Sequence, residues 1–71
     1  MEKISIKTEF IKLDAFLKFC GEAGTGGEAK LIVADGKVRV NGEVCVMRGK
    51  KLYNGDRVSA PGGEYVIDSG E

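Results

Sequence analysis

The chain has 71 residues, of which 42% are hydrophobic and 31% charged, and its formal net charge is zero. This composition excludes a disordered chain, and the length suits one domain with a modest core, expected over residues 1–71. The sequence has neither the roughly 18 uncharged apolar residues of a membrane span nor the apolar stretch of a signal peptide, so a cytoplasmic location is expected.

The N-terminal third predicts a strand and then a helix. Ile4 and Ile6 alternate with polar neighbours, which indicates a short strand over about Lys3 to Lys7. Apolar residues then recur at i, i+3, i+4 and i+7, which gives one apolar stripe along a short helix. The stripe consists of Leu13, Phe16, Leu17 and Cys20.

A second helix is predicted to begin at Thr25. Thr25 and Glu28 have the spacing of a capping box, in which each side chain satisfies a free backbone amide. Gly36 suits the left-handed position that closes a helix. The apolar stripe is Ala29, Ile32 and Val33, and Lys30 and Lys37 should project together from a neighbouring edge.

The spacing of apolar residues then changes from the helical repeat to the alternation that is typical of strands. Asn41-Gly42 lies between two valine-rich segments, 38–40 and 44–46, and is a strong signal for a β-hairpin. Val38 and Val40 should face the core, which turns Arg39 the other way. Further strands are expected at 57–59 and 65–67, separated by turns at 54–56 and 61–63. The order β-α-α-β-β-β-β predicts an α+β domain with two short helices packed on a small, mostly antiparallel sheet.

The residue types disfavour catalysis and cofactor binding. The chain has no histidine, which removes the commonest general base, and its carboxylates are scattered. Cys20 and Cys45 are too few for a standard zinc site, and they are interpreted as two small core residues, with a structural disulfide as the alternative. No catalytic residue, metal, cofactor or small-molecule substrate is therefore expected.

The glycine-rich segment 24–29 formally fits the dinucleotide pattern G-x-G-x-x-A. That interpretation requires a preceding strand, whereas a helix precedes the segment here, so a turn between the helices is expected instead. Unpaired amides at a helix N-terminus attract anions. The backbone of Thr25, Gly26 and Gly27 is accordingly a candidate site for one phosphate.

The zero net charge hides an asymmetry along the chain. Between Lys30 and Arg57 there are seven basic and three acidic residues, whereas the rest of the chain has four basic and eight acidic residues. Such a dipolar protein can steer an anion to one face. The densest basic run is 48–51, for which a solvated surface is the alternative. Tyr53 beside it is interpreted as a core or rim tyrosine, with base stacking as the alternative.

An ordered set of motifs from Leu13 to Val58 resembles the S4 RNA-binding domain. The motifs are Leu13-Asp14-Ala15-Phe16-Leu17, Ala29-Lys30-Leu31-Ile32, Gly36-Lys37-Val38-Arg39-Val40-Asn41-Gly42 and Gly55-Asp56-Arg57-Val58. The Gly26-Gly27-Glu28-Ala29-Lys30 segment is similar to that of the stand-alone S4-like proteins of the YaaA/YbcJ type. The resemblance implies an S4-like fold built on the αL motif.

The same resemblance implies a non-catalytic protein that binds structured, possibly ribosomal, RNA through a basic face. The matching positions are Lys30, Lys37, Arg39, Arg48, Lys50 and Lys51. Many S4 domains have Ser-Arg where this chain has Thr25-Gly26, which removes one expected phosphate contact. Two alternatives stay open: a protein-interaction module using the same basic face, and a ubiquitin-like sulfur carrier, which would need its Gly62-Gly63 at the C-terminus.

Overall fold

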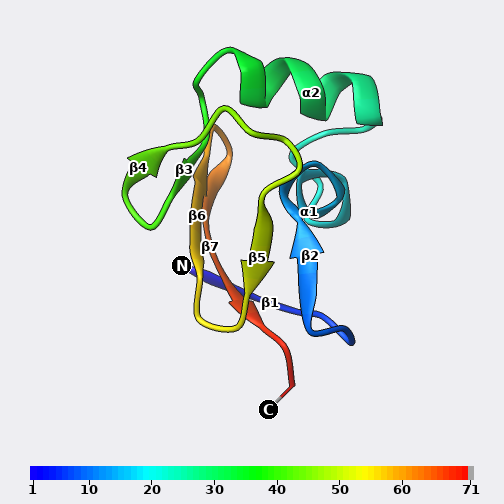
Figure 1. The fold of residues 1–71 in the computed structure, drawn as a ribbon, viewed down its shortest axis with the longest axis vertical. Helices are drawn as coiled ribbons and strands as arrows, with labels where there is room; N and C mark the ends of the chain where they lie inside the picture. The colour runs from blue at the N-terminus through cyan, green and yellow to red at the C-terminus, as the bar shows by residue number, and fades with distance from the viewer. Residues whose placement is uncertain (71) are drawn as a thin grey trace.

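A computed structural model describes residues 1–70, and within them two helices accompany two sheets (Figure 1). The elements in chain order are β1 (Glu2–Ser5), β2 (Phe10–Lys12), α1 (Leu13–Phe19), α2 (Gly26–Ala34), β3 (Arg39–Val40), β4 (Glu43–Val44), β5 (Lys51–Tyr53), β6 (Arg57–Ala60) and β7 (Gly63–Asp68). Neither helix has the length and apolarity required to cross a membrane.

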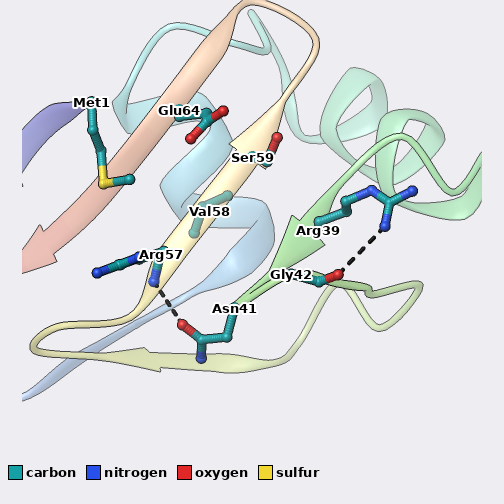
Figure 2. Close-up of a pocket in the computed structure, with 8 residues that line it drawn as sticks. All are labelled: Met1, Arg39, Asn41, Gly42, Arg57, Val58, Ser59 and Glu64. Carbon is teal, nitrogen blue, oxygen red and sulfur yellow. Dashed lines mark hydrogen bonds between the residues drawn. The ribbon is translucent and has the colours of Figure 1, made fainter.

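The larger sheet has five strands in the order β1-β7-β6-β3-β4, and β2 pairs with β5 in a separate two-stranded ribbon. Only the β1–β7 pair is parallel within the described residues, and the other pairs are antiparallel. Both helices lie on the same side of the larger sheet (Figure 2). The predicted α+β architecture, with two short helices on a mostly antiparallel sheet, is therefore confirmed.

The core forms between the helices and the inner faces of both sheets. Helix α1 contributes Leu13, Phe16 and Leu17 to this core. Each is fully buried, which confirms most of the predicted apolar stripe. The Phe16 ring packs edge-on against that of Tyr65 from β7, with 5.7 Å between the ring centroids. The complete set of buried apolar residues is Ile4, Ile6, Leu13, Phe16, Leu17, Ala23, Ala29, Val33, Val38, Val40, Leu52, Val58, Tyr65 and Ile67.

The second helix begins and ends where the sequence predicts. The Thr25 hydroxyl oxygen accepts a hydrogen bond from the Glu28 amide (3.1 Å), and the Glu28 carboxylate accepts one from the Gly24 amide (2.8 Å). The carboxylate thus reaches one residue further back than in a standard capping box. Gly36 has φ +72°, the left-handed conformation that ends a helix at low cost for glycine.

The predicted hairpin joins β3 to β4 through a two-residue loop. Asn41 and Gly42 both have positive φ, +53° and +88°, which matches the twist of the paired strands. Val38 and Val40 are buried while Arg39 is exposed, as the alternation predicts.

The ribbon is the main departure from the predicted order of elements. The sequence pattern predicts no strand at 10–12 or 51–53, because three residues are too few to show a period of two. The strand expected at 44–46 is also shorter, since β4 ends at Val44 and Val46 is 61% exposed. Cys45 is consequently half-buried at the start of a loop, rather than inside a strand.

A carboxylate links the segment after α1 to the β6–β7 turn. Glu22 accepts hydrogen bonds from the Tyr65 hydroxyl and from the Gly62 amide, the latter at 3.0 Å. Tyr65 is buried, so this contact satisfies its hydroxyl group, as buried tyrosines require. The hydrogen bond to Glu22, together with burial, raises the pKa of Tyr65 above its usual value of 10.

Candidate nucleic-acid interface

All six basic side chains predicted from the sequence are exposed, and they come from five parts of the fold. Lys30 lies on α2, Lys37 follows that helix, Arg39 is on β3, Arg48 and Lys50 are in the loop 45–50, and Lys51 opens β5.

The loop 45–50 is fixed by backbone hydrogen bonds to the start of α1. The Leu13 amide donates to the Lys50 carbonyl oxygen (2.8 Å) and the Asp14 amide to that of Arg48 (2.9 Å). These amides belong to the first turn of α1 and have no partner within the helix, so the loop satisfies them. The basic loop is therefore held against the helix by its main chain, and its cationic side chains remain free to contact a ligand.

The ribbon adds a basic residue that the sequence did not indicate. Lys12 on β2 lies directly opposite Lys51 on β5, and both side chains are exposed. Like charges at opposed positions of an antiparallel pair are destabilising. The pairing of these lysines depends on two short strands far apart in sequence, so only the tertiary structure reveals it.

Arg39 is not brought to the loop and ribbon. It lies on the uncovered side of the larger sheet, near Arg57 and opposite the side on which the helices pack (Figure 2). Its guanidinium donates a weak hydrogen bond to the Gly42 carbonyl oxygen at 3.4 Å. The neighbouring Asn41 is structural, because its side-chain oxygen accepts a hydrogen bond from the Arg57 amide at 3.0 Å.

Lys37 adjoins the beginning of the basic loop. The Cys45 amide donates to the carbonyl oxygen of Val38, the residue after Lys37, at 2.9 Å. Lys30 lies earlier on α2, but the helix ends at Ala34, so helical spacing does not place Lys37 on the same edge as Lys30. The hydrogen bond between Cys45 and Val38 places Lys37 next to the segment that begins the loop.

At the start of α2, some capping groups are already occupied. The Thr25 hydroxyl oxygen accepts from Glu28, and the Glu28 carboxylate brings a negative charge to the Gly24 amide. Phosphate binding by the backbone of Thr25, Gly26 and Gly27 stays a prediction, and the nearby carboxylate opposes it.

The cysteines are free thiols that pack against the core while half-buried. The structural disulfide considered from the sequence is therefore not formed. Burial raises the pKa of the Cys20 thiol, which disfavours the reactive thiolate. Among residues 1–70, no three His, Cys, Asp or Glu side chains are grouped so as to hold a metal ion.

Comparison with known proteins shows similarity to a protein family and to a named relative. Residues 4–68 match the family model of the S4 domain. The chain is also similar to a protein of Bacillus subtilis (strain 168) named "Probable ribosome maturation protein RlbA", with 46% identity over 59 residues, or 83% of each chain. The motifs, the fold and the match to nearly the whole chain agree, and the protein belongs to the S4 domain family.

Proposed function

We propose that this protein is a non-catalytic RNA-binding protein that recognises structured RNA of the ribosome or its precursors. Membership of the S4 domain family supports RNA as the ligand. The relative named as a probable ribosome maturation protein supports a ribosomal target. The proposed binding surface centres on the basic loop and the exposed face of the ribbon, with Arg48, Lys50, Lys51 and Lys12 as its cations.

The observation that carries this proposal is the opposition of Lys12 and Lys51 beside the anchored loop. Two like charges in register raise the free energy of the free protein, and an anionic ligand offsets that cost. The backbone hydrogen bonds from Leu13 and Asp14 hold the loop in place before RNA arrives. Less conformational entropy is then lost on binding.

The mechanism follows from the shape of double-stranded RNA. Its deep, narrow major groove hides the base edges, so small domains bind its phosphates and riboses and read its shape. Each lysine or arginine that contacts a phosphate releases a counterion, and affinity therefore falls with increasing salt. Lys30 on α2 and Lys37 after the end of that helix extend the surface, whereas Arg39 faces another side and should contribute less.

The first test removes the positive charges of Lys50 and Lys51, whose main-chain groups connect the loop to α1 and to the ribbon. In a Lys50→Ala, Lys51→Ala double variant the backbone contacts persist, while both side-chain charges are lost. We expect weaker binding to many RNA sequences, and a salt dependence flatter by roughly two counterions. Fluorescence anisotropy with a labelled RNA duplex across a salt series measures both quantities.

A matched control carries Lys3→Ala and Lys18→Ala, which are also exposed and change the net charge equally. Its affinity and salt slope should stay close to those of the wild type. Equal losses in both variants would mean that only net charge matters, and an unchanged Lys50/Lys51 variant would place the site elsewhere.

Crosslinking in cells, followed by sequencing of the bound RNA, identifies the target. Enrichment of ribosomal RNA or its precursors is the expected result. If a protein partner remained bound after nuclease treatment, that result would instead favour the protein-interaction alternative. The sulfur-carrier alternative finds no support, because Gly62 and Gly63 lie at the β6–β7 turn and β7 continues to Asp68.

A further inference from the structure

The exposed face of the β2/β5 ribbon carries an aromatic pair as well as the two lysines. The inner pair of the ribbon is Ile11 and Leu52, of which Leu52 is fully buried. Because side chains alternate along a strand, the two flanking pairs point to the opposite, solvent side. These pairs are Phe10 with Tyr53 and Lys12 with Lys51.

The rings of Phe10 and Tyr53 contact each other and a lysine. Their centroids are 5.7 Å apart with a tilt of 47° between the ring planes. The Lys51 ammonium lies 4.8 Å from the Phe10 centroid, within the range of a cation–π interaction. Phe10 is half-buried, whereas Tyr53 is 44% exposed, so Tyr53 offers the larger free aromatic surface.

The main chain of Tyr53 is held in place by the turn that follows β5. The Tyr53 amide donates to the Asp56 carboxylate at 2.8 Å, and the Asp56 amide donates to the Tyr53 carbonyl oxygen at 3.0 Å. The same carboxylate accepts a hydrogen bond from the Asn41 side chain at 3.2 Å. The Asp56 carboxylate is thus occupied by hydrogen bonds within the turn.

A shallow hollow adjoins Tyr53 at the end of the ribbon away from the two opposed lysines. Its lining is polar and comes from the segment before β2, from the β5–β6 turn and from the residue after β7: Lys7, Thr8, Glu9, Asn54 and Ser69. Lys7 and Glu9 bring opposite charges to this wall. The hollow therefore favours a neutral group with hydrogen-bonding edges more than it favours a phosphate.

We propose that Phe10 and Tyr53 form a platform on which one unpaired base of the bound RNA stacks. Lys12 and Lys51, on the same face, contact the phosphate beside that base. The proposal rests on the proposed function, which it deepens by adding a single-stranded nucleotide to the duplex that the basic loop contacts. Unpaired bases stack readily on exposed aromatic rings, with little dependence on sequence.

The test compares two RNA probes with the same stem. One is a blunt duplex, and the other carries a short single-stranded extension that includes the fluorescent base 2-aminopurine. We expect the wild type to bind the extended probe about fivefold or more tighter than the blunt one, and to quench the 2-aminopurine. Tyr53→Phe should keep this preference because it keeps the ring, whereas Tyr53→Leu should lose both the preference and the quenching.

Controls separate stacking on the ribbon from loss of folding and from the loss of an exposed ring elsewhere. The circular dichroism spectrum and melting temperature of Tyr53→Leu should match those of the wild type, which shows that the domain is folded. Phe19→Leu alters another exposed aromatic, on α1, and should retain the preference.

Equal binding of both probes by the wild type would overturn the platform and leave the proposed function standing. The same conclusion follows if Tyr53→Leu keeps the preference and the quenching. Failure of the wild type to bind either probe at low salt would overturn the proposed function, and the platform with it.

Discussion

The solvent-facing sides of the larger sheet and of the ribbon differ in the charges of the side chains that lie opposite one another. On the larger sheet, Arg39 lies opposite Ser59, which in turn lies opposite Glu64, so charges of both signs share the surface. On the ribbon, Lys12 lies opposite Lys51 beside two aromatic rings. A mixed surface suits solubility, whereas a like-charged pair beside exposed rings reduces stability unless an anionic ligand is bound.

The inner sides of the two sheets are alike, because both contribute to one core. Val40 and Val58 from the larger sheet and Leu52 from the ribbon are all at least 96% buried, and Ile11 packs against the same cluster. In the proposed function, the residues that stabilise the fold and those that bind RNA therefore lie on opposite faces of the same short strands. Substitutions on the two faces of the ribbon should separate the two properties.

The largest effect is expected at Leu52, the fully buried residue of β5. Leu52→Ala leaves a cavity and should lower the free energy of unfolding by about 2–5 kcal/mol. That is a large part of the stability of a small domain. Urea denaturation followed by circular dichroism measures the loss. A change of less than about 0.5 kcal/mol, the range of surface substitutions, would show that the ribbon is not part of the core.

A smaller, pH-dependent effect is expected at Tyr65, whose hydroxyl donates to Glu22. Because the pKa of Tyr65 is raised in the folded protein, its contribution is complete below the unfolded value of about 10 and is lost as pH rises through the folded value. Tyr65→Phe should lower stability at pH 7 by about 1–3 kcal/mol, since the Glu22 carboxylate loses a buried partner. Melting temperatures from pH 7 to 11 measure both effects.

The difference between the wild type and Tyr65→Phe should narrow above pH 10. A constant difference across this range would contradict the role assigned to the Glu22–Tyr65 hydrogen bond. This contact joins the α1 side to the larger sheet, so the variant should leave the exposed face of the ribbon and its RNA affinity unchanged at pH 7.

The smallest change in the free energy of unfolding is expected at Lys12, and it is an increase, whereas the other substitutions lower this free energy. Its side chain makes no capping hydrogen bond to α1, so Lys12→Ala removes a like charge opposite Lys51 without removing a cap. We expect unfolding free energy to rise by about 0.2–1 kcal/mol at low salt and the gain to shrink as salt screens the pair. RNA affinity should fall in the same variant. If Lys12→Ala lowered stability at low salt, the claim that the Lys12–Lys51 pair destabilises the exposed face of the ribbon would be wrong.

The elements that depend on local patterns were predictable from the sequence. The apolar stripe of α1, the Thr25 cap and the Gly36 closure of α2, and the Asn41-Gly42 hairpin all follow from residues within one or two turns of chain. Their geometry is set by side-chain period, by capping hydrogen bonds and by the φ angles that asparagine and glycine tolerate. The exposure of the basic residues in the loop follows from their charge alone.

Only the tertiary structure decided which distant segments meet. The parallel pairing of β1 with β7, the opposition of Lys12 to Lys51 and the contact of Glu22 with Tyr65 each join residues nearly 40 or more positions apart. The three-residue strands of the ribbon are too short to carry a periodic signal. Burial of Leu52 against the core fixes the ribbon in place. That packing sets the register, and it brings a cationic and aromatic surface to one face of the protein.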